Sequence, residues 1–303
     1  MKKKLTEENL KKIIKKASKN LLIEEIKINS DNFNKLKEYL HNQEFLDGKQ
    51  VGLLFQFNKN NNYPIGFIIK NLEKNIVGFM GTLFYEKLIN NKKFIFCNIH
   101  SWIVNKSYRL NSFFLITPLL NEKLNLTAYT PVKSLKGLLE KFGLNKRILN
   151  YKIVINISLF RFNKKKFIIE TKENIILNHL NNNEIVEFKK YSDKIFNKFI
   201  ILNKNNNKHI LIVAKKIKKK FINLFNFFYI SNVSEFRTNW ANIKNSISNE
   251  FNINIFSEYY FDNNESFFPS DILFYKIIKM NIYSKTTLEL NKFDIQNSDL
   301  LIS

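Results

Sequence analysis

The stretch from Cys97 to Tyr129 holds several side chains that could do chemistry. Cys97 supplies a thiol, and His100 supplies an imidazole whose ordinary pKa of about 6.5 suits proton transfer at neutral pH. Arg109 stands in the polar turn Asn-Lys-Ser-Tyr-Arg-Leu-Asn. A turn that leads into a helix presents unpaired N–H groups and the positive end of the helix dipole, so Arg109 would complete a phosphate site there. Arg109 thus indicates a candidate phosphate site, and His100 is a side chain that could transfer a proton.

An apolar strand and an apolar helix must position these side chains. The strand FIFCNIHSWIV ends at Val104, and the helix is expected to run from about Ser112 to Leu120. Successive strand residues point to opposite faces, so one face should carry Asn98, His100 and Trp102 and the other Cys97, Ser101 and Ile103.

The elements around this segment predict a mixed α/β fold. A strand at residues 20–28 and a helix capped by Asp31 come first. Two hairpins follow, with turns at NLEKN and LINNKK. After the apolar helix come the strand LNLTAYT, the helix PVKSLKGLLEKFG with proline at its start and glycine at its end, and the strand YKIVINISLF. This order predicts a mostly antiparallel sheet flanked by helices, with one crossover that places two central strands in parallel.

The second half restarts this pattern after the lysine-rich stretch RFNKKK. We therefore expect two domains, residues 1–158 and residues 159–303. The second should contain strands around the turn NKNNNK, a helix capped by Ser234 and the strand INIFSEYYFD. The run Lys215–Lys220 is most simply a solvated helix end or loop.

The first half resembles the GNAT superfamily of acyl-CoA N-acyltransferases. NIVGFMGTLFYEK is similar to the central hairpin of that family, NKSYR to the approach to its pyrophosphate loop, and LKGLLEKFGL to its closing helix. The loop of the family reads Arg or Gln, two variable residues, Gly, one variable residue, then Gly or Ala. The matching positions in this chain run from Arg109 to Phe114. The second half is interpreted as a degenerate repeat of the same fold.

The resemblance implies a site for acetyl-CoA or another acyl-CoA, with strands that splay after Val104 and Thr127. Its expected contacts are Ile103, Val104, Arg109, Leu110, Asn111, Ser112 and Phe113. His100 is the candidate general base, although a core or surface histidine with satisfied hydrogen bonds is the slightly favoured alternative. Leu139 stands where the family often has an acidic tyrosine, so Tyr129 or Tyr108 is the candidate acid. Cys97 is expected to be a buried strand thiol rather than a nucleophile.

The loop departs from the family pattern at Ser112 and Phe114, which replace two small residues. Small residues let the backbone approach a pyrophosphate closely. Two outcomes stay open. Either Ser112 caps the helix while Phe113 and Phe114 point into the core, or the two rings fill the place of the cofactor.

Composition limits the other classes of function. The 303 residues carry 49 Lys and Arg against 26 Asp and Glu, a net charge of +23, but only four residues are arginine. Because Asn, Ile and Phe are inflated together with Lys, coding bias explains the charge better than a nucleic-acid partner. One cysteine and four histidines offer neither a disulfide nor zinc-type spacing. No segment has the apolar length of a membrane span, and the N-terminal twenty residues resemble an amphipathic helix rather than a secretory signal.

The predicted function is therefore acyl-CoA-dependent N-acylation of a small amine in the cytoplasm. An amino sugar or sugar nucleotide of surface polysaccharide synthesis is the acceptor suggested by the resemblance. The alternative is a catalytically silent scaffold of the same fold that binds a partner or an anionic polymer. No metal is expected.

Overall fold

The structure is a computed structural model, and it describes residues 21–43, 55, 62–120, 124–157, 167–191, 195–204, 208–219, 222–261, 265–286 and 288. The amphipathic helix expected in the first twenty residues and the expected boundary stretch RFNKKK lie outside these residues. The chain divides into two compact units. The first unit comprises residues 1–147 and 281–303, and the second comprises residues 148–280.

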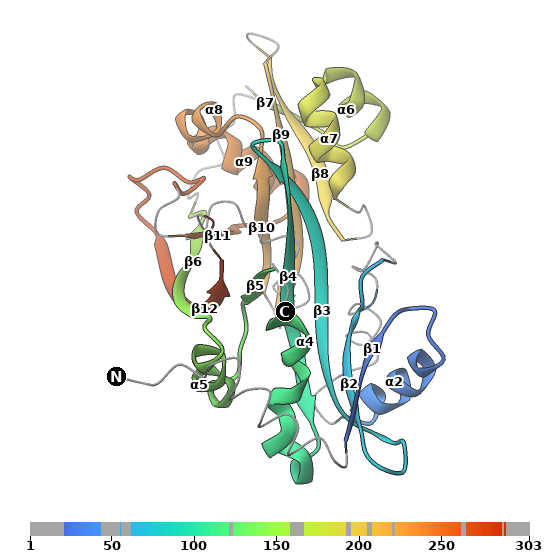
Figure 1. The fold of residues 1–303 in the computed structure, drawn as a ribbon. Coiled ribbons are helices and arrows are strands. Elements are labelled where there is room, and N and C mark those ends of the chain that lie inside the picture. Colours follow the sequence, from blue (N-terminus) through green and yellow to red (C-terminus); the bar gives the residue numbers. More distant parts are fainter. Residues whose placement is uncertain are drawn as a thin grey trace. The chain divides into compact units, whose positions relative to one another are not determined.

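The first unit is a mostly antiparallel sheet with helices on its faces (Figure 1). Its strands lie in the order β1-β2-β3-β4-β5-β12, where only the C-terminal part of β12 belongs to this unit. β4 and β5 are parallel, and every other neighbouring pair is antiparallel. This confirms the predicted fold class and the parallel crossover. The elements are β1 (Leu22–Ile26), α2 (Asn32–His41), β2 (Gly66–Lys70), β3 (Ile76–Ile89), β4 (Lys92–Val104), the 3-10 helix η2 (Lys106–Leu115), α4 (Thr117–Leu120), β5 (Asn125–Ala128), α5 (Lys133–Lys141) and β12 (Tyr275–Lys285).

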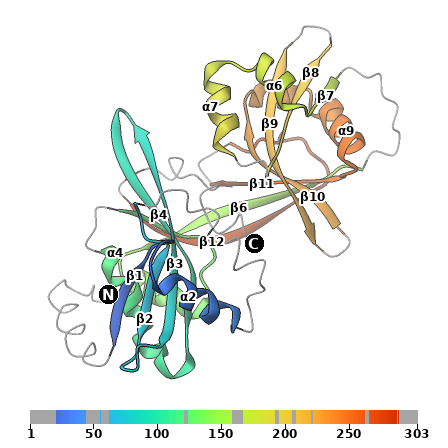
Figure 2. The ribbon, with the colours of Figure 1, turned by 90° about the vertical axis from the view of Figure 1, so that its right-hand side faces the viewer.

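Tight turns fix the register of the long β3–β4 hairpin, which is plainly visible in Figure 2. Asn90 and Asn91 both have positive φ, 50° and 59°, the left-handed conformation that asparagine tolerates better than most residues. The helix α5 is followed by Gly143, whose φ is 84°, as the glycine at its C-terminal end predicts. Asp31 precedes α2 as expected, but its side chain makes no capping hydrogen bond.

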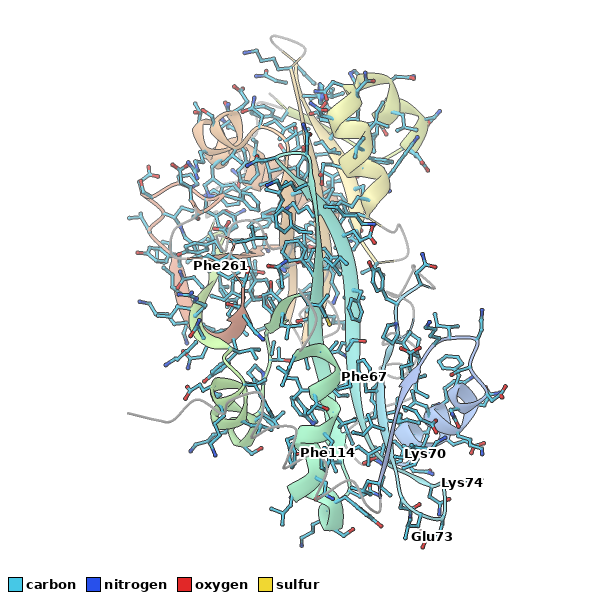
Figure 3. The ribbon with its side chains drawn as sticks, in the orientation of Figure 1. Phe67, Lys70, Glu73, Lys74, Phe114 and Phe261 are labelled. Atoms are coloured by element: carbon cyan, nitrogen blue, oxygen red, sulfur yellow. The ribbon has the colours of Figure 1, made fainter. Side chains whose placement is uncertain are left out.

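Two apolar cores lie on opposite faces of this sheet. The larger core joins β4 and β5 to η2, α4 and α5, and it includes Phe67 and Phe114, which Figure 3 labels. The smaller core joins α2 to β1, β2 and β3 and includes Ile103 at the end of β4. Both faces of the central strands are therefore covered, as in other sheets flanked by helices.

The second unit repeats the strand pattern of the first. Three antiparallel strands, β8, β9 and β10, are followed by helices and by β11, which is parallel to β10. The strand order is β6-β11-β10-β9-β8-β7. The elements are β6 (Asn145–Ile155), β7 (Phe167–Glu170), α6 (Glu173–His179), α7 (Asn182–Lys190), β8 (Asn197–Asn203), β9 (His209–Lys219), β10 (Ile222–Ile230), α8 (Val233–Thr238), α9 (Trp240–Phe251) and β11 (Ile255–Phe261).

Several local expectations were wrong. The helix after β4 does not begin near Ser112, because a 3-10 helix already starts at Lys106. The run from Lys215 lies in strand β9 up to Lys219, and the helix after β10 is capped by Asn232 rather than Ser234. The units also differ from the expected division, since residues 148–158 belong to the second unit and residues 281–303 to the first. None of the helices among the described residues is long and apolar enough to cross a membrane.

Candidate functional site

The two parallel strands of the first unit part within β4. Their register runs from Phe96–Asn125 to Asn98–Thr127, and the Thr127 hydroxyl donates to the Asn98 side-chain oxygen at 3.2 Å. β4 continues for six residues beyond this last pair, to Val104, while β5 ends at Ala128. The edge of β4 that faces β5 is therefore not paired with β5 from Ile99 onward, which is earlier than the splay expected after Val104.

A β-bulge marks the point where the strands separate. The β3–β4 register shifts between Phe79–Ile103 and Gly81–His100, and Ser101 has a φ of 46°. An extra residue reverses the alternation of side chains beyond it. Trp102 consequently packs against the larger core with Cys97, whereas Ile103 packs on the α2 face. The expected grouping of Trp102 with His100, and of Ile103 with Cys97, was wrong.

His100 lies two residues beyond the last paired residue of β4, and its side chain is almost fully buried, with 7% exposure. Its Nδ1 is 3.1 Å from the Ser101 hydroxyl, and its ring lies over Gly81 of β3. Burial lowers the pKa of His100 to about 4, which a backbone hydrogen bond with Thr82 only partly opposes. The imidazole is therefore neutral at physiological pH and able to accept a proton.

Tyr129 lies two residues beyond Thr127, the last paired residue of β5. His100 on β4 and Tyr129 after β5 thus occupy corresponding positions, each two residues past the end of the hydrogen-bonded pairing between these two strands. Tyr129 is buried, whereas Tyr108 is half-buried against the larger core. Cys97 is fully buried and desolvation raises the pKa of its thiol well above the ordinary value, which supports the expectation of an inert strand cysteine.

The expected phosphate-binding segment lies in η2. Arg109 is exposed, Leu110 is 90% exposed, and Phe114 is fully buried in the larger core. The ring of Phe113 is 4.2 Å from that of Phe114 and packs against the same core, so both aromatic side chains face the core rather than solvent. Of the two outcomes left open, the structure supports the inward orientation of the rings.

The backbone of this segment differs from the expectation. Asn111 and Ser112 lie inside the 3-10 helix, where N–H groups bond the carbonyl three residues earlier, so Ser112 is not a helix cap. The start of the helix, where N–H groups lack an intrahelical partner, is at Lys106 and Ser107. Lys106 is exposed and adds a second cation close to Arg109.

Two further residues belong to this site and were not predicted as contacts from the sequence, although Trp102 was placed on a strand face there. Gly81 accommodates the ring of His100, since a Cβ at this position would lie 2.3 Å from His100 Cε1. The indole Nε1 of Trp102 is a buried donor that has no hydrogen-bond partner among the described residues. The bulge that moves Trp102 to the other face has no signal in the alternating pattern of the strand. Within the described part of the chain, no group of His, Cys, Asp and Glu side chains is placed to hold a metal ion.

No protein-family model and no curated protein matches the sequence. Several solved structures, however, are similar to it in fold. A GCN5-related N-acetyltransferase from Anabaena variabilis is 12% identical, with a TM-score of 0.57 over 87% of this chain and 72% of that chain. A conserved protein of unknown function from Enterococcus faecalis, a probable N-acyltransferase, is 10% identical, with a TM-score of 0.54 over 87% of this chain and 72% of its own.

A third similar structure is the GCN5-related glucosamine N-acetyltransferase region of a fungal multi-domain GH3 β-N-acetylglucosaminidase. It is 12% identical, with a TM-score of 0.53 over 88% of this chain and 38% of that longer chain. These shares of the present chain exceed what either of its units could contribute alone. The likeness therefore extends over residues of both units.

Proposed function

Because the chain has the fold of the GCN5-related N-acetyltransferases, we propose that it is an acyl-CoA-dependent N-acyltransferase that acts on a small amine. The observation that carries this proposal is the separation of β4 from β5 after Asn98 and Thr127. The separation leaves one edge of β4 without its neighbouring strand next to a neutral histidine. An extended ligand with amide groups can pair with such an edge as an additional strand would.

The residues around this edge fit the pantetheine part of an acyl-CoA. Backbone polar groups of β4 between Ile99 and Val104 supply donors and acceptors that need partners when they are covered. The buried Nε1 of Trp102 supplies one more donor. Ile103 and Val104, the expected contacts on β4, place apolar side chains on the two faces of the strand.

The phosphates of the same ligand would meet η2. Arg109 and Lys106 offer exposed cations there, and the N–H groups of Lys106 and Ser107 stand at the helix start. Leu110 lies on the exposed side of η2, whereas Phe113 packs against the core and would support the loop from behind. The backbone contacts first expected from Leu110, Asn111 and Ser112 are assigned instead to the preceding turn.

His100 would accept the proton of the attacking amine, and Tyr129 would protonate the departing thiolate. Their corresponding positions beyond the ladder support this division of roles. The imidazole is neutral at physiological pH, the form that accepts a proton, but a pKa of about 4 makes it a weaker base than an ordinary histidine. General acid–base catalysis contributes about 10²–10⁴-fold to a rate. An amino sugar is the proposed acceptor, a choice supported by the glucosamine N-acetyltransferase region among the similar structures.

Thermal denaturation with and without acetyl-CoA tests the proposal. A ligand that binds the native state alone must raise the melting temperature, and a concentration of one hundred times Kd stabilises by about 2.7 kcal/mol. Arg109→Ala should weaken the affinity for acetyl-CoA about tenfold or more by removing charge-assisted hydrogen bonds, which lowers the stabilisation by about 1.4 kcal/mol at saturating ligand. Arg147→Ala, which removes an exposed arginine of β6, should leave it unchanged. Thiol release from acetyl-CoA with glucosamine then tests the transfer.

A catalytically silent scaffold is the second candidate, and the 3-10 conformation of η2 favours it. Because the N–H groups of residues 110–112 are engaged within the helix, a pyrophosphate has fewer backbone donors than in a glycine-rich loop. The same denaturation experiment decides between the two. Absence of any stabilisation by acetyl-CoA, propionyl-CoA and palmitoyl-CoA at millimolar concentration would exclude the enzyme.

A further inference from the structure

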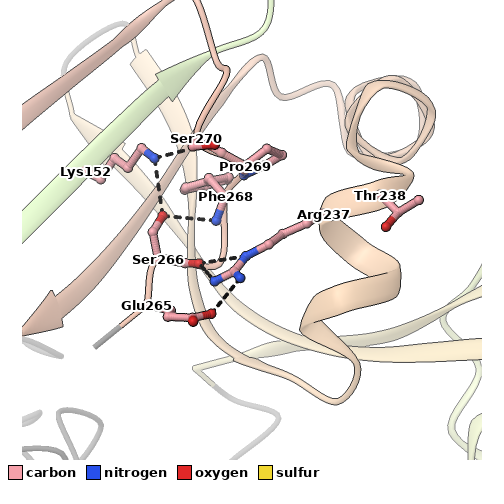
Figure 4. Close-up of a pocket in the computed structure, with 8 residues that line it drawn as sticks. All are labelled: Lys152, Arg237, Thr238, Glu265, Ser266, Phe268, Pro269 and Ser270. Atoms are coloured by element: carbon pink, nitrogen blue, oxygen red, sulfur yellow. Dashed lines mark hydrogen bonds and ion pairs between the residues drawn. The ribbon is translucent and has the colours of Figure 1, made fainter. Parts of the chain in front are cut away.

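The second unit contains a cavity of about 560 Å³ that is distinct in its lining from the β4–β5 site (Figure 4). Its lining comes from β6, from α8 and from the loop that follows β11. Every lining residue belongs to the second unit. The lining residues are Lys152, Arg237, Thr238, Glu265, Ser266, Phe268, Pro269 and Ser270.

Lys152 brings a nearly buried positive charge to this cavity. Its residue exposure is 6%, and its ammonium donates to the Ser266 hydroxyl at 3.3 Å and to the Pro269 carbonyl at 3.5 Å. Both bonds are long for an ammonium group, which normally uses three donors. Among the described residues no carboxylate lies within ion-pair distance of Lys152 Nζ. The rings of Tyr275 and Phe268 lie 5.2 and 5.8 Å from Nζ, and the charge of Glu258 also attracts the ammonium, so the buried charge is partly compensated. The two hydrogen bonds use two of its three N–H donors, which leaves one for a further acceptor.

Arg237 brings a second cation, from α8. Its Nε donates to the Ser266 carbonyl at 3.0 Å, its Nη2 donates to the same oxygen, and its Nη1 contacts Glu265 Oε2 at 2.7 Å. These three bonds hold the guanidinium plane in place. A guanidinium has five N–H donors, and contacts with the described residues engage three of them, which leaves two for a further acceptor. Figure 4 shows Lys152 and Arg237 approaching Ser266 from two different elements.

Glu258 of β11 fixes the loop between these two cations. Its carboxylate is 1% exposed and accepts hydrogen bonds from the Ser266 hydroxyl and from the Phe267 N–H, the latter at 2.6 Å. Burial raises the pKa of Glu258, although these hydrogen bonds and Lys152 oppose the shift. The carboxylate therefore positions Ser266 and does not line the cavity.

We propose that this cavity binds a small ligand that carries a phosphate or carboxylate group on an apolar body. The anionic group would take the free donors of Lys152 and Arg237, which are the residues that suit a planar or tetrahedral oxyanion. Phe268 and Pro269 form an apolar wall for the body of the ligand. The volume lies within the usual range of about 300–1,000 Å³ for small-molecule sites.

Calorimetry on the full chain with phenyl phosphate, benzoate and inorganic phosphate tests this site. Phenyl phosphate or benzoate should bind saturably and more tightly than inorganic phosphate, and comparison of the two organic probes identifies the preferred anionic group. Lys152→Met and Arg237→Met should each weaken binding about ten- to hundredfold, the range of a hydrogen bond to a charged group. Lys198→Met is the matched control, because Lys198 is a partly buried lysine of the same unit that lines another cavity.

A second experiment uses the unaltered protein, so that its result does not depend on whether the variants fold. It measures how strongly a bound ligand protects arginine side chains from chemical modification. Phenylglyoxal modifies exposed arginines, and peptide mapping separates Arg237 from Arg147, which is exposed on β6. Phenyl phosphate should slow modification of Arg237 and leave that of Arg147 unchanged. Equal rates with and without all three anions at Arg237, or binding that survives both methionine substitutions, would overturn the proposal.

Discussion

His100 illustrates how burial decides the form in which a residue is available. Its pKa of about 4 means that it is already neutral across the physiological range of pH. We predict that His100→Gln lowers turnover about 10²–10⁴-fold, because glutamine preserves size and hydrogen bonding but accepts no proton. The ratio of the rates of the two proteins should stay constant between neutral and mildly alkaline pH. Turnover of His100→Gln within twofold of the original would return this residue to a packing role.

The same burial makes His100 an acid-sensitive element of stability. A histidine whose pKa is lower in the folded than in the unfolded chain binds fewer protons when folded, so stability is complete above about pH 6.5 and falls as the pH drops towards 4. The loss amounts to roughly 3 kcal/mol. In His100→Gln this contribution to the pH dependence should disappear, which urea denaturation at a series of pH values would measure.

Tyr129 is tested by removing only its hydroxyl. Tyr129→Phe keeps the buried ring, so the fold should be retained, while protonation of the thiolate should slow. Because a thiolate is already a good leaving group, we expect a smaller effect than for His100→Gln, on the order of tenfold. Tyr108→Phe is the control, since Tyr108 lies in η2. A larger loss from Tyr108→Phe than from Tyr129→Phe would reverse the assignment of the two tyrosines.

At the scale of single residues, the sequence identified side chains more readily than their surroundings. His100 and Arg109 stand out by type and by their place between a strand and a helix. Gly81 could not be linked to His100, because the two meet only through the β3–β4 register. Lys152 and Arg237 are likewise distant in the chain and meet at Ser266, so neither suggested a cavity.

At the scale of elements, the β3–β4 hairpin holds the site, and Gly81 is its most restrictive position. We predict that Gly81→Ala destabilises the protein by about 1–3 kcal/mol, the usual cost of overpacking, since the added methyl would overlap the His100 ring. Gly137→Ala is the matched control. Gly137 lies in α5 with nothing near its Cβ position, so alanine there should stabilise by up to about 1 kcal/mol.

A double substitution separates the cause of this effect. If the clash with the ring is responsible, Gly81→Ala combined with His100→Ala should be less destabilised than the sum of the two single changes. Denaturant unfolding of the four proteins provides the cycle. Simple additivity of the two changes would show that the alanine disturbs the β3 backbone instead.

Elements with strong local signals were predicted well, and elements shaped by tertiary contacts were not. The β3–β4 turn carries asparagine at its two positions of positive φ, Asn90 and Asn91, so its location was evident. The 3-10 helix was missed because the polar residues before Ser112 indicated a turn and the apolar ones after it a helix, whereas a 3-10 helix already begins at Lys106. The end of strand β9 was not predicted, because its run of lysines was interpreted as a solvated helix end or loop. Lys216 and Lys218 are exposed while Ile217 between them is half-buried, which is the alternation of a strand within a basic run.

At the scale of the whole molecule, two units use one strand pattern with different side chains. The parallel pair β4–β5 of the first unit corresponds to β10–β11 of the second, and both follow an antiparallel meander. Helix-covered cores lie on both faces of each sheet. The descent of the second unit from a repeat of the first stays a prediction, since a shared pattern alone leaves common origin unproven.

The charge of the whole chain leads to a last prediction. A net charge of +23 attracts any polyanion at low ionic strength. Lysine supplies nearly all of the positive charge, however, and arginine, which most often makes specific hydrogen bonds to DNA bases, is scarce. We expect duplex DNA and heparin to bind weakly, without preference for sequence, and to be released as the salt concentration rises, since phosphate contacts are lost with counterion competition. Fluorescence anisotropy across a salt series measures this. Affinity that persists at physiological salt and discriminates between DNA sequences would instead assign the positive charge to a dedicated nucleic-acid site, and the coding-bias interpretation would be abandoned.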